Sequence, residues 1–517
     1  MLNSVDFSGR PFHFVGVGGI GMSALAYILA KCGLPVTGSD VRLSHITKRL
    51  QKEGVHIFWQ QQESNLSFFQ TPQAIAASAP RQSSSSQLGR NLGVTAAVQA
   101  AKQPSASADL LPQVICSTAI DKSNSEYRAA LELGCPIFHR SDLLAALMSH
   151  YSGVAVAGTH GKTTTSSLIG YLLLKANLDP TIIVGGEVAA WEGNAHLGQG
   201  DYLVAEADES DGSLVKLSAQ IGVITNIELD HPDHYSTLEQ VVGIFETFAR
   251  RCQTVVGCID CQTVKQAIQP DVSYSLNPET DADYVADDVT HYAGGTLATI
   301  WERGQRLGQL RLPLLGRHNL SNALAAIAVG RLVGLDFALI AEILSSFQGA
   351  RRRFEQRGLH KGILFVDDYA HHPSEIRATL SAARLKASEE PEQFPQRRVI
   401  AIFQPHRYSR TATLLSEFAA AFSQADQVIV TDIYSAGEKN VYDIGGYAVT
   451  EAIAQHHSQV KYRASLAEVT QELTQELQSG DIVLFLTAGN LNQVIPDVMD
   501  YYQRQTHPSL AEAAQLA

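Results

Sequence analysis

The stretch Val154–Thr165 reads VAVAGTHGKTTT, and a segment with helical periodicity, Ser166–Lys175, follows it. A short apolar strand that runs into Gly-Lys-Thr and then a helix has the strand–loop–helix context of a P-loop. In such a loop, successive N–H groups and the positive end of the helix bind phosphate oxygens. The position five before Gly161 is Val156 rather than glycine, so the loop is shorter than the standard form. The stretch predicts a parallel α/β sheet that binds ATP or GTP.

Each residue of this loop is a candidate nucleotide contact. Lys162 would neutralise the β- and γ-phosphates, and the Thr163 hydroxyl could bind Mg²⁺. The predicted nucleotide-binding residues are Gly158, Thr159, His160, Gly161, Lys162, Thr163 and Thr164.

Acidic residues follow two further strands of the same predicted sheet. Tyr202–Ala205 leads into Glu206 and the motif EADESD, and Ile221–Thr225 leads toward Asp230 and His231. Carboxylates at strand ends beside a P-loop are typical Mg²⁺ ligands, and a neutral imidazole could serve a second metal ion. Taken singly, each acidic residue is equally compatible with a solvated loop. Their common position after parallel strands favours a metal site, to which the Thr163 hydroxyl and the carboxylates of Glu206, Asp208, Glu209 and Asp211 are candidate contributors.

A second glycine-rich loop lies near the start of the chain. Phe12–Val15 reads as a strand, and the run that follows it satisfies G-x-G-x-x-G before a helical segment, Met22–Cys32. Asp40 follows a second strand at the distance where an acidic residue can hold a ribose hydroxyl. The loop suits a nicotinamide dinucleotide or another nucleotide diphosphate; glycines that only pack helix on strand are the structural alternative. The candidate diphosphate-site residues are Gly16, Gly18, Gly19, Gly21 and Asp40.

Two polar clusters follow strands late in the chain. Ile363–Val366 runs into DDYAHHP at Asp367–Pro373, and Val399–Phe403 runs into QPHRYSRT at Gln404–Thr411. The carboxyl ends of parallel strands mark the crevice where such sheets bind ligands. Arginines of the second cluster could hold a small carboxylate bidentately, or they could belong to a surface ion-pair network. The candidate residues are Asp368, Tyr369, His371, His406, Arg407 and Arg410.

A helix predicted after Gly316 begins with the residues RHNLSN. Its two asparagines, Asn319 and Asn322, either cap the helix or bond an adenine edge.

Length and composition bound the remaining possibilities. The 517 residues predict about three domains. With a net charge of −13, the chain lacks the excess of basic residues that is typical of a nucleic-acid binder. No apolar run is long enough to cross a bilayer. Without a signal-like start, the expected location is the cytoplasm. The fold class is α/β: a Rossmann-like domain at 1–150, a P-loop domain with a parallel sheet at 151–350 and a Rossmann-like domain at 351–517. A Gln- and Ser-rich insertion is expected at about 60–112.

A nucleotide switch would not require two nucleotide-type loops, predicted metal ligands and a separate cationic cluster. A ligase requires all of them, because it holds ATP, a carboxylate to be activated and an amine that attacks it. GVGGIGMS, GTHGKTT, EADESD, DDYAHHP and QPHRYSRT occur in this order, together with Asp230-His231 and His318-Asn319. With these motifs the chain resembles the bacterial Mur ligases over nearly its whole length, most closely the members that attach L-alanine to UDP-N-acetylmuramate.

The resemblance implies an ATP-dependent carbon–nitrogen ligase of peptidoglycan synthesis that passes through an acyl phosphate. The first glycine loop would hold the UDP-sugar diphosphate. Thr163 and Glu206 would bind one Mg²⁺ and His231 a second. Asn319, Asn322 and Arg352 would contact adenine or other parts of ATP. The amino-acid pocket would consist of Tyr369, His371, His406, Arg407 and Arg410. Asp368 or His371 would transfer the proton. Lys162 would hold the ATP phosphates, and the chain is expected to be a monomer or a weak homodimer.

The sequence also departs from the family pattern. No lysine lies between Lys216 and Lys265, where several Mur ligases carry a carbamylated lysine, and Arg351 stands where a hinge glycine is usual. The nearest rival interpretation is a murein tripeptide ligase with the same sugar nucleotide. A nicotinamide-dependent oxidoreductase and a non-catalytic nucleotide-binding protein are more distant rivals, because they leave the arginine cluster and the metal ligands unexplained.

Overall fold

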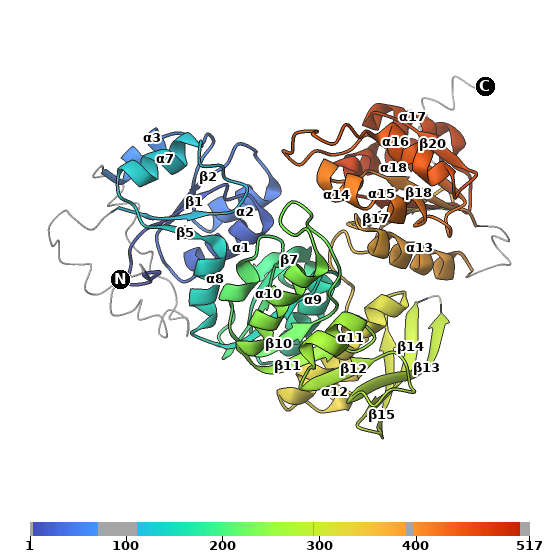
Figure 1. The fold of residues 1–517 in the computed structure, drawn as a ribbon, viewed down its shortest axis with the longest axis horizontal. Coiled ribbons are helices and arrows are strands. Elements are labelled where there is room, and N and C mark those ends of the chain that lie inside the picture. Colours follow the sequence, from blue (N-terminus) through green and yellow to red (C-terminus); the bar gives the residue numbers. More distant parts are fainter. Residues whose placement is uncertain (1–3, 71–110, 293, 389–396, 507–517) are drawn as a thin grey trace. The chain divides into compact units, whose positions relative to one another are not determined.

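The structure is a computed structural model, and it describes residues 4–70, 111–292, 294–388 and 397–506 (Figure 1). The chain divides into two compact units. The first contains the described residues of Met1–Glu228 with Glu239–Tyr274 and Ala325–Ile343, and the second contains Leu229–Leu238, Ser275–Leu324 and the described residues of Leu344–Ala517.

The first unit opens with a Rossmann-like sheet of five parallel strands in the order β3-β2-β1-β4-β5. Its strands are β1 (Phe12–Val15), β2 (Val36–Ser39), β3 (His56–Phe58), β4 (Gln113–Cys116) and β5 (Ile137–His139). Its helices are α1 (Ile20–Lys31), α2 (His45–Lys52), α3 (Ser64–Ser67), the 3₁₀ turn η1 (Phe68–Gln70), α7 (Ser125–Glu132) and α8 (Arg140–Met148). β1 lies at the centre and is fully buried, so the glycine loop that follows it sits at the middle of the sheet edge.

The same unit contains the P-loop sheet, with strands in the order β12-β11-β10-β6-β9-β7-β8. All neighbours with a printed register are parallel except β7 and β8. The strands are β6 (Ser152–Ala157), β7 (Thr181–Val188), β8 (Gly193–His196), β9 (Tyr202–Glu206), β10 (Ala219–Ile224), β11 (Cys252–Cys258) and β12 (Val272–Ser275). The helical segments are α9 (Lys162–Lys175), η2 (Ala189–Trp191), η3 (Ser213–Lys216), α10 (Leu238–Arg250), η4 (Val264–Ile268) and α12 (Phe337–Leu344). Parallel strands β6, β9 and β10 end at one edge, which is where the P-loop and the acidic motif lie.

Besides the segment Leu229–Leu238, the second unit contains an antiparallel meander and the C-terminal α/β domain. The meander consists of β13 (Tyr284–Tyr292), β14 (Gly295–Glu302) and β15 (Gln305–Leu312). Helix α11 (Arg317–Leu332) follows it, and the division between the units falls within this helix. The later sheet has the order β16-β17-β21-β18-β19-β20, in which only β16 runs antiparallel to its neighbour.

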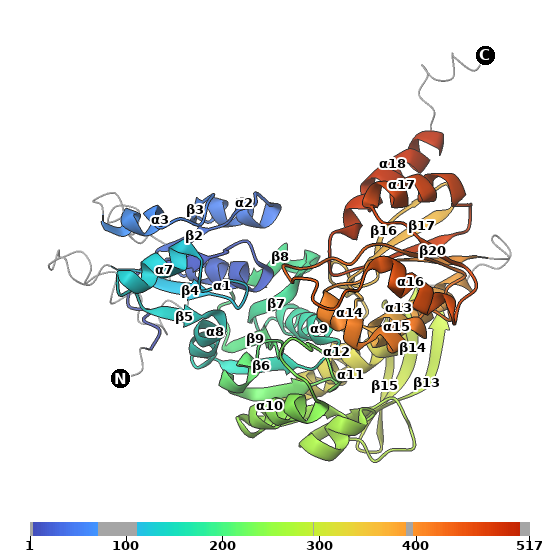
Figure 2. The same cartoon turned by 45° about the horizontal axis from the view of Figure 1, so that its top comes forward.

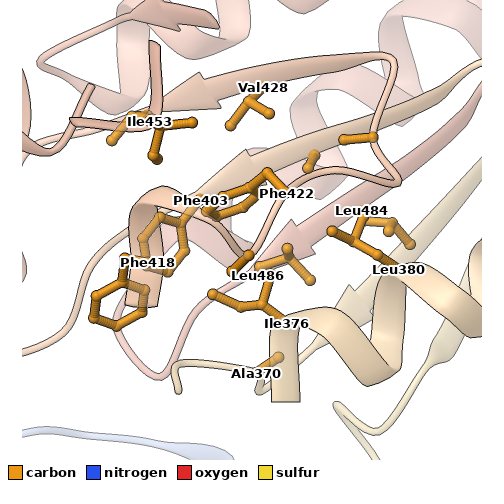
Figure 3. Close-up of a cluster of buried hydrophobic side chains, with 14 of the residues drawn as sticks. Ala370, Ile376, Leu380, Phe403, Phe418, Phe422, Val428, Ile453, Leu484 and Leu486 are labelled. Carbon is orange, nitrogen blue, oxygen red and sulfur yellow. The ribbon is translucent and has the colours of Figure 1, made fainter. Parts of the chain in front are cut away.

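Helices cover both faces of the C-terminal sheet, as Figure 2 shows. Its strands are β16 (Glu355–His360), β17 (Ile363–Asp368), β18 (Val399–Phe403), β19 (Gln427–Val430), β20 (Val460–Tyr462) and β21 (Ile482–Leu486). Its helices are α13 (Pro373–Ala387), α14 (Tyr408–Thr413), α15 (Leu415–Ala419), α16 (Gly446–Ala454), α17 (Leu466–Glu476), the 3₁₀ turn η5 (Leu491–Gln493) and α18 (Val494–Thr506). Alternate strand residues face opposite sides, so Phe403 packs with Phe418 and Phe422 on one face (Figure 3) while Phe365 and Phe485 pack on the other.

The sheets confirm the predicted α/β class, and the predicted strands Phe12–Val15 and Val399–Phe403 agree with β1 and β18 to the residue. Most of the other predicted strands and helices are longer in the structure than the sequence predicted. Helix α9 begins at Lys162 rather than Ser166, because the P-loop leads directly into its first turn. Helix α11 already begins at Arg317, so Asn319 and Asn322 lie inside it, and the prediction that they cap it is wrong.

The predicted insertion at about 60–112 is described only at its two ends. Residues 64–70 form α3 and η1, where Leu66 and Phe69 are buried against the first domain, so the insertion begins later than expected. Residues 71–110 lie outside the described part of the chain. Among the described residues, no helix is both long and apolar enough to cross a membrane.

Candidate active site

The glycine loop of the first domain is held by strand β2. The N–H groups of Gly16 and Val17 both donate to the carbonyl of Ser39 at 2.9 Å, and Gly16 has a φ of 80°. Asp40 lies beside the loop, as the motif spacing predicted, but its carboxylate accepts the N–H of Gly18 at 2.7 Å. A diphosphate bound by this N–H would therefore have to displace the Asp40 carboxylate.

A buried polar network under this loop was missed by the sequence analysis. The ring of His13 contacts the Thr37 hydroxyl at 2.6 Å and the Glu126 carboxylate at 2.7 Å. Glu126 also accepts from the Ser39 hydroxyl and from the Asn65 amide, at 2.6 and 2.8 Å. His13 and Glu126 have no exposed surface. No sequence motif links these scattered positions, which meet only because β1, β2, α3 and α7 pack together.

The P-loop has the backbone that phosphate binding requires. Gly158 and Gly161 have φ values of 140° and 81°, and a β-carbon at Gly158 would clash with the Thr225 hydroxyl. The Asn226 side chain accepts the N–H of His160 at 2.8 Å and donates to its carbonyl at 3.1 Å. Asn226, two residues after the end of β10, therefore fixes the orientation of the loop, a role that the sequence did not reveal.

Lys162, the predicted phosphate-binding lysine, is engaged by the protein in this structure. Its Nζ donates to the carbonyls of Gly158 and Thr159 at 2.6 and 3.1 Å and to the Glu209 carboxylate at 2.8 Å. Burial lowers the pKa of Lys162, but the Glu209 and Asp208 carboxylates outweigh it, so the net shift is upward. Burial raises the pKa of Glu209 to about 7, against the opposing effect of Lys162. Glu209 is thus a site residue that the sequence analysis quoted within EADESD but gave no role.

The predicted Mg²⁺ ligands of the first unit lie on the P-loop sheet. Thr163 is buried in the first turn of α9, and Glu206 is the last residue of β9. The Glu206 carboxylate accepts the N–H of Gly185 at 2.7 Å, and a β-carbon at Gly185 would lie only 2.5–2.7 Å from its atoms. A hydroxyl and a carboxylate are the hard oxygen donors that Mg²⁺ prefers, so these residues fit the ion.

His231, the third predicted ligand, belongs to the second unit. It has a φ of 55°, and its N–H donates to the carboxylate of Asp230 at 2.7 Å. The Asp230 side chain is in turn bound by Arg410, with Nε and Nη2 at 2.7 and 3.2 Å from its two oxygens. Arg410 and Asp230 are buried, and although burial raises the pKa of Asp230, Arg410 and His231 hold it well below its usual range.

Arg407, predicted beside Arg410 in the carboxylate pocket, is more accessible. Its side chain is 32% exposed, and its Nη1 contacts Asp233 at 3.0 Å and Glu438 at 3.1 Å. Its φ of 72° with ψ of 138° is a conformation that costs a non-glycine residue roughly 1–3 kcal/mol, and such strain gathers at functional sites. Of the two arginines, Arg410 is committed to a buried ion pair, and Arg407 has the freer guanidinium.

Two neutral imidazoles lie beside these arginines. The rings of His371 and His406 are 5.9 Å apart, and His406 stacks on Tyr434 at 5.7 Å. Burial lowers the pKa of His371 to about 4, and burial with the nearby His371 and Arg410 lowers that of His406 to about 2. His371 Nδ1 lies 2.8 Å from the Tyr369 carbonyl and 3.2 Å from Glu375. Both rings are therefore uncharged at neutral pH.

Asp368 holds the DDYAHHP loop in place. Its carboxylate accepts the N–H groups of Phe354 and Ala370 at 2.6 and 2.8 Å and the Thr379 hydroxyl at 3.2 Å. Burial raises its pKa to about 6. With both oxygens bonded to the protein, Asp368 is better suited to positioning the loop than to taking a proton from a substrate.

The arginine-rich segment before β16 is built around Tyr369. The guanidinium carbons of Arg352 and Arg353 lie 4.8 and 5.1 Å from the centre of the Tyr369 ring. The residues of this described segment with a positive φ are Gly349, Arg352 and Phe354. Arg351, at the position where a glycine is usual, is not one of them. The backbone at Arg351 therefore does not require glycine.

The predicted adenine contacts lie in the second unit. Asn319 Nδ2 donates to the carbonyl of Leu315 at 2.8 Å, so one end of its amide is used within the protein. Asn322 is buried one turn further along α11. The neighbouring His318 is half-buried, and desolvation lowers its pKa to about 4.

A P-loop, a second glycine-rich loop and clusters of acidic and basic side chains at strand ends are the features expected of an acid-activating ligase. The chain belongs to the Mur ligase family: the Mur ligase catalytic domain matches residues 11–152, the Mur ligase middle domain residues 156–330 and the Mur ligase glutamate ligase domain residues 352–489. Similarity extends to individual members. The UDP-N-acetylmuramate–L-alanine ligase of Nostoc punctiforme is 61% identical over 96% of this chain and 98% of its own length. That of Gloeothece citriformis is 58% identical over 96% and 99%.

Solved structures agree with this assignment. The UDP-N-acetylmuramate-alanine ligase of Thermotoga maritima has a TM-score of 0.75 and 26% identity, covering 96% of this chain and 99% of its own. A murein peptide ligase of Psychrobacter arcticus shares the fold, with a TM-score of 0.65 and 20% identity over 96% and 99% of the two chains.

Proposed function

We propose that this Mur ligase joins L-alanine to the lactyl carboxylate of UDP-N-acetylmuramate, with cleavage of ATP to ADP and phosphate, in peptidoglycan precursor synthesis. The observation that carries the proposal is full-length similarity: relatives 55–61% identical over at least 96% of this chain bear the name of that reaction. The murein peptide ligase shares only the fold, so it gives no comparable support for a peptide substrate.

The first half of the reaction uses the P-loop. The lactyl carboxylate attacks the γ-phosphorus of ATP, and ADP leaves, which forms an acyl phosphate. Lys162 exchanges its Glu209 partner for phosphate oxygens and neutralises charge on the transferred group, while the N–H groups from Gly158 to Thr164 orient the phosphates. Thr163 and Glu206 would hold one Mg²⁺ and His231 a second, and the ions would supply charge screening for the phosphoryl group. Asn319, Asn322 and Arg352 contact the rest of ATP.

The second half uses the cluster of the C-terminal domain. The amine of L-alanine attacks the acyl carbon, and the tetrahedral intermediate expels phosphate and forms the amide bond. Arg407 binds the alanine carboxylate, since its guanidinium is the more exposed of the two. Arg410 supports this pocket through Asp230, and Tyr369 and His406 line it. His371 and Asp368 are the candidates for taking the amine proton: both Asp368 oxygens already accept hydrogen bonds from the protein, whereas the neutral His371 ring has the lower pKa.

The setting of the enzyme follows from the same proposal. UDP-N-acetylmuramate and L-alanine are its substrate partners. The Gly16–Gly21 loop holds the diphosphate, and Asp40 bonds a ribose hydroxyl of the nucleotide. Such precursors are made in the cytoplasm, so we place the enzyme there, as a monomer or weak homodimer.

Phosphate release is the direct test. Purified enzyme with ATP, Mg²⁺ and UDP-N-acetylmuramate should release phosphate when L-alanine is offered, less with glycine or L-serine, and little with a murein tripeptide. Release with the tripeptide and none with L-alanine would reverse the assignment.

A further inference from the structure

Arg140 lies at the same sheet edge as the first glycine loop. It is the first residue of α8 and follows directly after the parallel strand β5. The carboxyl ends of parallel strands in one sheet share an edge, and α8 packs against α1, the helix that the glycine loop opens. A β-carbon at Gly21 would lie 3.7 Å from Nη1 of Arg140, so the guanidinium reaches the first turn of α1.

The guanidinium is anchored from its other side by the acidic motif. Nη2 of Arg140 donates to the carboxylates of Asp208 and Asp211 at 2.7 and 3.3 Å. Asp211 is buried, while the Arg140 side chain keeps 20% of its surface exposed. In the part of the chain that the structure describes, these are the only hydrogen bonds of the guanidinium, so Nε and Nη1 retain donors on the side of Gly21.

An anchored arginine of this kind is organised to bind an anion. A guanidinium fixed by carboxylates loses little conformational freedom when a ligand arrives, and its planar fork matches phosphate oxygens. The motif Gly16–Gly21 itself carries no cation, and the Gly18 N–H is shared with the Asp40 carboxylate. A cation from elsewhere in the domain would therefore add to the attraction that the loop N–H groups and the N-terminus of α1 exert on a diphosphate.

We propose that Arg140 binds the diphosphate of the sugar nucleotide and positions it at the glycine loop. This inference rests on the proposed function, because it assumes a uridine diphosphate ligand. Arg140 would also join that ligand to EADESD, the motif that carries Glu206 and Glu209 of the ATP site.

The test is direct binding of UDP and of UDP-N-acetylmuramate to full-length Arg140→Gln, measured by calorimetry. Loss of one or two charge-assisted hydrogen bonds should weaken both ligands by about 10- to 100-fold. Binding of ATP should change much less, and Arg140→Lys should restore only part of the affinity.

Lys216→Gln is the matched control. Lys216 pairs with Asp142 of α8 at 2.7 Å, so it joins α8 to the segment after EADESD as Arg140 does. If Lys216→Gln weakens UDP as much as Arg140→Gln, the role of Arg140 is only structural and the inference falls. The inference also falls if Arg140→Gln binds UDP with the affinity of the wild type. It falls as well if the variant binds only UDP-N-acetylmuramate more weakly, because that result would point to a contact with the lactyl carboxylate. Wild-type enzyme that binds neither uridine nucleotide would instead contradict the proposed function.

Discussion

Replacing Gly185 by alanine tests whether Glu206 is the Mg²⁺ ligand, without touching a charged residue. A β-carbon at this position would lie 2.5 Å from Oε1, 2.6 Å from Oε2 and 2.7 Å from Cδ of Glu206. Ordinary contact begins at about 3.4 Å. The carboxylate must therefore retreat by about 0.7–0.9 Å, against the hydrogen bond that draws it to the Gly185 N–H.

Such a displacement is large compared with what a metal site tolerates. Ligand distances usually lie within about 0.2 Å of their ideal values, and misplacing a reacting group by about 1 Å can cost roughly 100-fold in rate. We expect Gly185→Ala to raise the Mg²⁺ concentration needed for half-maximal activity and to lower kcat about 100-fold. The KM for UDP-N-acetylmuramate should change little, because the sugar-nucleotide loop lies in another domain.

The assay is phosphate release over a Mg²⁺ titration, with thermal unfolding to check that the variant folds. Gly243→Ala is the matched control: it makes the same change in α10, where a β-carbon meets nothing within 4 Å. A folded Gly185→Ala enzyme with the Mg²⁺ dependence of the wild type would refute the assignment of Glu206. Glu206→Gln should resemble Gly185→Ala if both act through the same ligand.

Three further predictions concern the remaining sites. Lys162→Ala should abolish acyl-phosphate formation, measured as ADP production before L-alanine is added, and normal ADP production would exclude the lysine from phosphoryl transfer. Arg410→Ala should raise the KM for L-alanine and lower the unfolding free energy by about 3–5 kcal/mol, because it leaves the Asp230 carboxylate buried without its partner; an unchanged KM would remove Arg410 from the pocket. The pKa of His371 is about 4 in the folded protein, whereas an unperturbed histidine has a pKa of about 6.5. Between these pH values the unfolded chain binds more protons at this residue than the folded chain does. The free energy of unfolding should therefore fall as the pH drops through this range. His371→Gln should lessen that loss in thermal unfolding, and an identical pH profile would contradict the shifted pKa.

Local sequence determined the elements that carry the chemistry. Apolar runs that end in glycine-rich or polar motifs predicted β1, β6, β17 and β18 and placed the P-loop and the DDYAHHP and QPHRYSRT clusters at strand ends. This succeeds because a strand, its following loop and the next helix are contiguous, so their period and their glycines are visible in one short window.

Tertiary structure alone decided how each candidate side chain is used. Asp40 was correctly placed beside the glycine loop, yet its carboxylate binds Gly18. Glu209 holds Lys162, and Asp230 holds Arg410, across separations in sequence that no motif spans. A buried charge without a partner is energetically costly. Each of these buried charged groups is therefore paired with the opposite charge that packing brings near it.

The sequence by itself therefore determined the family, the strand–loop–helix units and the places of the candidate residues along them. It did not determine the partners of those residues or the network of His13 and Glu126, because these contacts arise from packing between elements far apart in the chain. The preference for Arg407 over Arg410 as the carboxylate ligand also comes from packing: burial commits one guanidinium to Asp230 and leaves the other partly exposed.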